Sequence, residues 1–222
     1  MKKVFFALIF FSFMSVSNLQ AKGCPSLNEE PEIEYYTSYG QLGYDFKKNQ
    51  LQITKLARQH NIIERGMFAS GLAIADIQWE ISLSTKGTLQ EDGSACIAPV
   101  KINLFIGYNS PMIYVANHLK KGTCEYDVVL RHEQTHQQIN KKALEYFHRY
   151  FYKQAQKIAQ EIKPIKIKSF TQEEINRATE EITQHYSQKL TPVLEHFKQE
   201  LKIEHSKLDN PENYGLESLL CK

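Results

Sequence analysis

The sequence has almost no net charge, and this absence limits the partners that the chain is expected to bind. The 222 residues include 27 Lys and Arg against 25 Asp and Glu. Two basic residues, Lys2 and Lys3, lie in an N-terminal segment that is expected to be removed, which leaves 25 residues of each sign. A balanced chain gives no electrostatic reason to expect nucleic acid or an anionic membrane surface as a partner.

Long apolar runs are missing after the first few residues. Residues 1–21, MKKVFFALIFFSFMSVSNLQA, have the basic start, short apolar core and small residues of a signal peptide. The apolar core is short for an uncleaved membrane anchor, and "AKG" is a poor match to the signal for a lipid anchor on Cys24. We therefore expect an exported protein, periplasmic or secreted, without a membrane span after signal removal.

Cysteines are few, and no two of them form a CxxC pair of the kind that binds metal. Cys24, Cys96, Cys124 and Cys221 are an even set in a chain expected to enter an oxidising compartment, which predicts two disulfides. Of the three possible pairings we favour Cys96–Cys124, tying a strand to a helix, and Cys24–Cys221, tying the two ends together.

The remaining residues, 22–222, predict one domain of the α+β class. Strands are expected at 33–40, 76–87, 95–108 and 112–119, with a helix at 48–62 between the first two. The links between consecutive strands are too short for helical crossovers, which predicts a small antiparallel sheet over residues 33–119. A turn-rich tail is expected at 209–222.

A long antiparallel helical hairpin is predicted for residues 125–208, packed on the sheet. The stretch 126–162 contains neither Gly nor Pro, Pro164 ends it, and Thr171 with Glu174 forms a capping box that starts a second helix. This second helix is expected to be interrupted or bent at Pro192. A short link between two long helices implies antiparallel neighbours.

The first of these helices contains HEQTH, which has the chemistry of a metal site. His132 and His136 are four residues apart, so both side chains lie on one helical face and can bind one zinc ion. Glu133 lies where it can take a proton from a metal-activated water. The alternative interpretation is a polar patch of two solvated histidines.

A catalytic zinc usually has three protein ligands, so the motif is incomplete by itself. The extended motif HExxHxxGxxH is excluded, because Ile139 occupies the glycine position and Lys142 the third histidine position. Glu145 on the same helix is nine residues beyond His136, about 13 Å along the axis. The third ligand must therefore come from another element.

The returning helix offers the candidates. If the turn is centred near Ile167, the two motif histidines face residues near 198 and 202. His205 lies close to this level, on the apolar stripe that faces the first helix, and is our predicted third ligand. Glu204 and Glu200 are the alternatives.

The segment CEYDVVLRHEQTH, the upstream strand with Trp79 and the closing LDNPENYG resemble a family of bacterial secreted proteins predicted to be zinc-dependent proteases. The resemblance implies a zincin-like domain, with His132 and His136 as ligands and Glu133 as the catalytic base. Members of that family carry a histidine before the glycine of the tail motif, where this chain has Tyr214 before Gly215. Tyr214 is thus a further candidate ligand, or a donor to the oxyanion.

The function predicted from the sequence is a zinc-dependent metallopeptidase that acts on a peptide or protein substrate. One alternative is a non-catalytic envelope binding or assembly module with a vestigial or structural metal site. Another is a helical-hairpin interaction protein without metal. The sequence leaves the substrate and the oligomeric state open.

Overall fold

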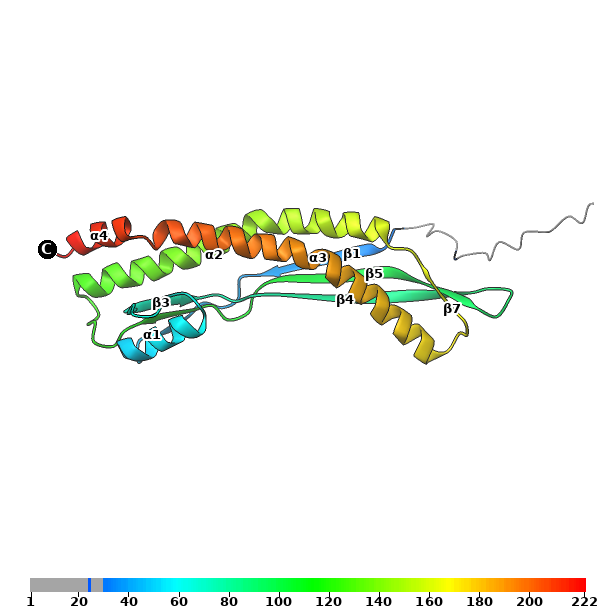
Figure 1. Cartoon of the computed structure of the whole chain (residues 1–222), viewed down its shortest axis with the longest axis horizontal. Coiled ribbons are helices and arrows are strands. Elements are labelled where there is room, and N and C mark those ends of the chain that lie inside the picture. Colours follow the sequence, from blue (N-terminus) through cyan, green and yellow to red (C-terminus); the bar gives the residue numbers. More distant parts are fainter. Residues whose placement is uncertain (1–23, 25–29) are drawn as a thin grey trace, which may run out of the picture.

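The computed structural model describes residue 24 and residues 30–222; the predicted signal peptide lies outside them. The molecule is elongated, with two long helices lying over two narrow sheets (Figure 1). Its elements in chain order are β1 (Glu32–Ser38), β2 (Gly43–Asp45), α1 (Gln50–Gln59), β3 (Gly71–Ile74), β4 (Ile77–Leu89), β5 (Ala95–Tyr108), β6 (Met112–Val115), α2 (Cys124–Glu161), β7 (Ile165–Ile167), α3 (Gln172–Leu208) and α4 (Pro211–Leu219). The predicted combination of helices with small sheets is confirmed in this coarse form.

The larger sheet is built on a long antiparallel pair, β4 and β5. Alternate residues of β4, such as Trp79 and Ile81, pack against the main core, as their spacing predicts. The expectation of a purely antiparallel sheet is wrong, because β1 pairs with β5 in parallel. The short-link argument holds only for consecutive strands, whereas β1 and β5 are separated by a long crossover that includes α1, β3 and β4.

A second sheet has the order β2-β6-β3, with β2 parallel and β3 antiparallel to β6. The predicted strand at 112–119 is therefore β6 of this separate sheet and does not pair with β5. Helix α1 covers part of the second sheet through Ile53 and Ala57, which are fully buried against Leu72 of β3. The sheet is small, and α2 lies against its β3 and β6 strands.

Helices α2 and α3 cover the larger sheet and share its core. Phe147 stacks on Phe197 with ring centroids 4.2 Å apart, and Phe151 and Tyr186 are fully buried. The Thr171 hydroxyl accepts the Glu174 backbone N–H at the start of α3, which is one half of the predicted capping box. The backbone N–H of Thr171 donates to the carbonyl of Ser169 instead of the Glu174 side chain. Helix α3 continues through Pro192, so of the two predicted outcomes, an interruption or a bend, the interruption is wrong.

The link between the two long helices has nearly the predicted length, but it contains a strand. Ile165–Ile167 forms a short strand, β7, that pairs with the start of β5. As a result the helices pair around the beginning of α3 rather than around Ile167, and His136 lies against His205. The tail at 209–222, predicted to be turn-rich, is mostly helical, because residues 211–219 form α4 with Asn210 as its N-cap.

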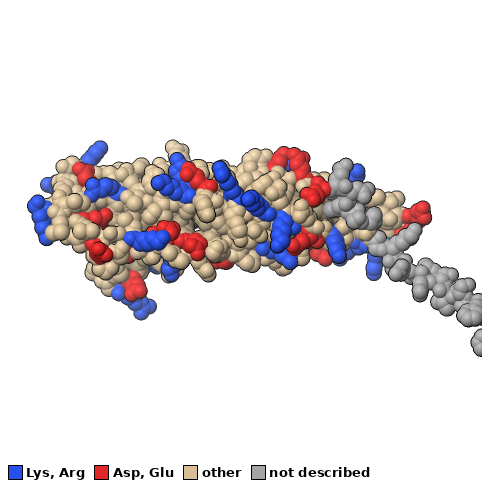
Figure 2. Space-filling view, turned by 90° about the horizontal axis from the view of Figure 1, so that it is seen from above, with Lys and Arg blue, Asp and Glu red and all other residues tan. Residues whose placement is uncertain are grey.

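Charged side chains of both signs are interspersed along the molecule, as Figure 2 shows for the face seen from above. Within the described residues, none of the helices combines the length and apolar character that a membrane span requires.

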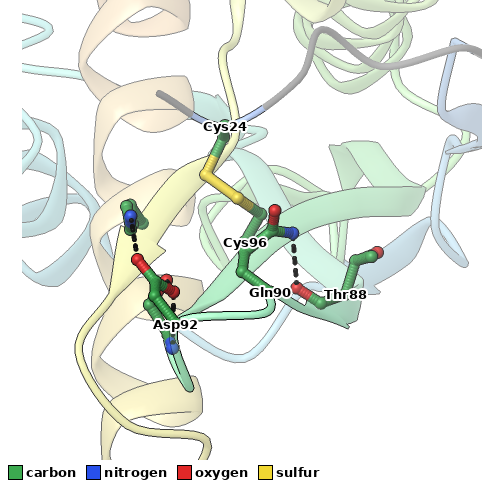
Figure 3. Close-up of a disulfide and its surroundings, with 7 residues drawn as sticks. Cys24, Thr88, Gln90, Asp92 and Cys96 are labelled. Carbon is green, nitrogen blue, oxygen red and sulfur yellow. Dashed lines mark hydrogen bonds and ion pairs between the residues drawn. A yellow bond between two sulfur atoms is a disulfide. The ribbon is translucent and has the colours of Figure 1, made fainter. Parts of the chain in front are cut away.

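The structure contains two disulfides, Cys24–Cys96 and Cys124–Cys221, so both favoured pairings are wrong. Cys96 lies near the start of β5, opposite Lys166 of β7, and meets Cys24 there (Figure 3). Cys124 begins α2 at the other end of the molecule, where the chain also ends. The length of the molecule separates Cys96 from Cys124, and each therefore pairs with the terminal segment beside it.

Candidate metal centre

The HEQTH motif lies in the third and fourth turns of α2, with its three functional side chains turned away from solvent. His132 is 6%, Glu133 6% and His136 8% exposed. Thr123 caps this helix by accepting the Tyr126 backbone N–H, which fixes where the helical register begins. The two histidines therefore lie on one face, with ring centroids 4.9 Å apart.

Asp209, the residue that follows α3, completes a group of three donors. Its Oδ1 lies 3.1 Å from His132 Nε2 and 3.2 Å from His136 Nε2, and the two Nε2 atoms are 3.2 Å apart. Ligands at 2.0–2.1 Å from a tetrahedral zinc ion are separated by about 3.3–3.4 Å. The three atoms thus form a nearly equilateral triangle of the size of one face of such a site.

This is the one group of at least three His, Cys, Asp or Glu residues, within the described part of the chain, whose ligand atoms lie close enough to share a metal ion. The His132–His136–Asp209 group could therefore hold a metal.

Glu217 of α4 orients His132. Both of its carboxylate oxygens lie 3.1 Å from His132 Nδ1, so this nitrogen carries the proton and donates it to the carboxylate. In the neutral form of His132 the lone pair is then on Nε2, which is the atom that faces Asp209. Histidines that bind a metal usually donate their other ring N–H to a carboxylate in this way, which fixes the orientation of the ring.

His136 is oriented by a longer chain of hydrogen bonds that begins at a backbone carbonyl. The carbonyl of Ile74 can only accept, so Gln137 donates Nε2–H to it at 3.2 Å. Gln137 Oε1 then accepts from Asn140 Nδ2 at 3.3 Å, which turns Asn140 Oδ1 toward His205 Nε2 at 2.9 Å. Each bond fixes the orientation of the next group.

The last step of this chain assigns the tautomer of His136. His205 donates Nε2–H to Asn140, so its Nδ1 is an acceptor, and it lies 2.8 Å from His136 Nδ1. Burial, with a smaller contribution from His136, lowers the pKa of His205 to about 4, so His205 is neutral at pH 7. His136 therefore donates Nδ1–H, and its Nε2 lone pair is directed at the donor triangle.

The electrostatics of the metal-free site favour a positive charge at its centre. Burial lowers the pKa of His132, but the carboxylates of Asp209, Glu133 and Glu217 outweigh burial and raise it to about 9. Burial raises the pKa of Asp209, but hydrogen bonds from His132 and from the Tyr214 hydroxyl hold it well below its usual range. Without a metal, a proton on His132 supplies the charge that the buried carboxylates require.

Glu133 lies on the side of α2 that faces β3. A Cβ on Gly71 would lie 2.4 Å from Glu133 Oε1, so only glycine leaves room for this carboxylate. The backbone N–H of Ala73 donates to the carboxylate. Burial raises the pKa of Glu133 to about 8, with His132 opposing the shift and Asp209 adding to it. The carboxyl group is thus held beside the donor triangle with its proton affinity increased.

The predicted third-ligand candidates occupy different places. His205 contacts His136 and lies outside the donor triangle. Glu200 and Glu204 are exposed, and Glu204 pairs with Lys207. Tyr214 stacks on the His132 ring and donates its hydroxyl proton to Asp209 Oδ1 at 2.6 Å.

Sequence reasoning missed Asp209 and Glu217. The predicted centre of the turn placed residues near 198 and 202 opposite the two motif histidines, whereas His205 and Asp209 lie there. The tail that carries Glu217 was not predicted to be a helix. The short helix α4 has no buried residue of its own. Its position depends on the Cys124–Cys221 disulfide and on the contacts of Tyr214 and Glu217 at the donor triangle.

Comparison with protein-family models, curated proteins and solved structures finds no match to this chain. The site is therefore interpreted from its own geometry.

Proposed function

We propose that the chain is an exported zinc-dependent metallopeptidase, in which His132, His136 and Asp209 hold the metal and Glu133 is the general base. The observation that carries the proposal is the triangle of Nε2, Nε2 and Oδ1 atoms with edges of 3.1–3.2 Å beside a buried carboxylate. The resemblance of HEQTH and its flanking residues to secreted bacterial proteins predicted to be zinc proteases supports the same function.

The donor set favours zinc among the common biological metals. Two imidazoles and one carboxylate form the ligand set of several zinc peptidases, whereas Mg²⁺ and Ca²⁺ prefer oxygen ligands alone. Edges of 3.1–3.2 Å are slightly shorter than those of a tetrahedral zinc site, a difference that small side-chain movements remove. Glu217 and His205 are the outer partners that metal-ligating histidines require.

A bound zinc ion would supply Lewis-acid activation of a water molecule. The contribution of the chain is to position and move the proton. Burial raises the pKa of Glu133 to about 8 in the metal-free site, and the positive charge of a bound metal would lower it again. The ionised Glu133 could then accept a proton during attack on a peptide carbonyl and return it to the leaving amine. Tyr214 has a hydroxyl beside the triangle and is the candidate donor to the developing oxyanion.

The proposal is tested by zinc content and by peptide hydrolysis. Wild type should bind about one zinc ion per chain and cleave casein or a fluorogenic peptide mixture. Glu133→Gln should keep the zinc and lose at least a hundredfold in kcat, because it removes the general base alone. Glu125→Gln, an exposed carboxylate on the same helix, is the matched control and should have wild-type activity. No zinc in the wild type, or full activity in Glu133→Gln, would overturn the proposal.

One observation favours a second candidate, a structural zinc site in a non-catalytic envelope binding or assembly module. The ring of Tyr214 lies on His132, whose side chain is only 7% exposed, so α4 restricts access to the metal position. A structural site has four protein ligands and no exchangeable water. Cobalt-substituted protein distinguishes the two, since an open site changes its visible spectrum with added hydroxamate or azide and a closed site does not.

Export remains part of the proposal. Two disulfides are consistent with an oxidising compartment. N-terminal sequencing of the protein recovered from the cell envelope or medium should begin at or near Lys22 if residues 1–21 are a signal peptide.

A further inference from the structure

The segment that precedes β3 carries an unusual set of exposed side chains. Four large apolar side chains within eighteen residues are open to solvent: Leu51 at 67%, Ile62 at 45%, Met67 at 49% and Phe68 at 68%. The opposite face of α1 is buried in the small core through Ile53 and Ala57, so the fold does not use the exposed residues. Exposed apolar side chains gathered in one segment indicate a surface that binds a protein or a membrane.

The same segment has a local charge surplus that the overall balance of the chain hides. Residues 47–68 contain five Lys or Arg and a single acidic residue, Glu64. Lys55, Arg58 and Arg65 are exposed, and within the described residues none of them forms an ion pair.

The loop after α1 is held in a defined shape. Arg58 donates from Nη2 to the carbonyl of Met67 at 2.9 Å, and the Ala69 N–H donates to the buried Thr54 hydroxyl at 3.0 Å. Met67 and Phe68 are therefore presented on a loop that is attached to α1 at both ends.

We propose that this surface, Leu51, Lys55, Arg58, Ile62, Arg65, Met67 and Phe68, docks on an anionic lipid membrane. Apolar tips between unpaired basic side chains match a bilayer interface, where rings and aliphatic chains enter the acyl region and cations contact anionic headgroups. The charge complementarity selects a lipid surface over a neutral partner. The balanced charge of the whole chain gives no reason to expect an anionic membrane as a partner. The local surplus of basic residues at this surface does give such a reason.

Docking here has a consequence for the metal centre. Three residues after Phe68 the chain reaches Gly71 of β3, which contacts Glu133. A molecule attached through this loop holds the donor triangle close to the membrane, and substrates anchored in or near the lipid are then favoured. The docking itself does not depend on the proposed peptidase activity.

The test is vesicle co-sedimentation of the chain from Lys22 onward, which excludes the apolar N-terminal segment. Vesicles of phosphatidylcholine with one-third phosphatidylglycerol should bind the wild type at least tenfold more strongly than phosphatidylcholine alone, and the difference should shrink in high salt. Lys55→Gln with Arg65→Gln should weaken this binding about twentyfold to thirtyfold, since each cation near the surface contributes about fivefold. Phe68→Ser should weaken it at least tenfold.

The matched controls are Lys153→Gln with Lys157→Gln, an exposed basic pair at the other end of α2, and Tyr146→Ser, an 87% exposed aromatic residue. These variants should bind as the wild type does, and circular dichroism should show all variants folded. No preference for anionic vesicles, or equal loss in the control variants, would overturn the proposal. So would sedimentation equilibrium showing a dimer without lipid that Phe68→Ser dissociates, because the surface would then bind a second copy of the chain.

Discussion

Replacement of His205 should weaken zinc binding through the tautomer of His136 and without loss of a ligand. In the structure His205 Nδ1 accepts the His136 Nδ1–H at 2.8 Å, which keeps the His136 Nε2 lone pair at the donor triangle. His205→Leu removes this acceptor and lets the His136 proton move to Nε2, where it blocks the metal. His205→Gln keeps an acceptor for His136 and a donor for Asn140, so it should restore most of the affinity.

The expected magnitudes separate an outer partner from a ligand. Loss of an outer-shell hydrogen bond typically costs 10–100-fold in metal affinity, and this range is expected for His205→Leu. Structural zinc sites bind with roughly 10–16 kcal/mol over four ligands, or about 2.5–4 kcal/mol for each. Asp209→Ala should therefore cost about 100-fold to 1,000-fold, and His205→Gln should remain within about threefold of the wild type.

The assay is competition for zinc against a chelator of known affinity, combined with the visible spectrum of the cobalt-substituted protein. Both His205 variants should keep the wild-type cobalt spectrum, because their donor set is unchanged, whereas Asp209→Ala should shift it. If His205→Gln is as weak as Asp209→Ala and its spectrum shifts in the same way, His205 is a ligand, as the sequence predicts, and the tautomer argument is refuted.

Three further predictions follow from the site. Zinc affinity should fall about tenfold per pH unit below pH 9, because the metal must displace the proton from His132, whose pKa the surrounding carboxylates raise to about 9; competition titrations between pH 6 and 8 measure this slope. Gly71→Ala should destabilise the protein by about 1–3 kcal/mol and displace Glu133, so that activity falls more than zinc content does; urea unfolding and peptide cleavage measure the two effects. Removal of the Cys124–Cys221 disulfide should lower stability by about 4–5 kcal/mol in the chain-entropy model and also weaken zinc binding, because α4 carries Glu217.

Two control variants make these predictions specific. Gly215→Ala meets no atom within 4 Å and lies inside α4, so it should be neutral or stabilise the fold by up to about 1 kcal/mol. Loss of the Cys24–Cys96 disulfide should lower the free energy of unfolding by a similar amount, because its sequence separation of 72 residues is comparable to the 97 residues of Cys124–Cys221. Zinc affinity should stay unchanged in this variant. Equal zinc loss in both disulfide variants would show that α4 is not held at the site by Cys221.

Local sequence signals determined the elements and the centre of the candidate site. The alternation of Trp79 and Ile81 with polar neighbours is sufficient to predict β4, because a strand exposes one face and buries the other. The four-residue spacing of His132 and His136 is sufficient to place both on one face of α2, because the helical period is a local property.

Tertiary structure decided what these local elements meet. A few residues of β7 in the turn move the pairing of α2 and α3 by more than a helical turn, and Asp209 comes to lie beside His132 while His205 moves to the far side of His136. The parallel pairing of β1 with β5 and both disulfides likewise depend on which distant segments share an end of the molecule. The spacing of residues along the chain determines which side chains share a face of one helix or strand. Contacts between distant elements depend on how those elements are aligned, and each turn between them can change that alignment.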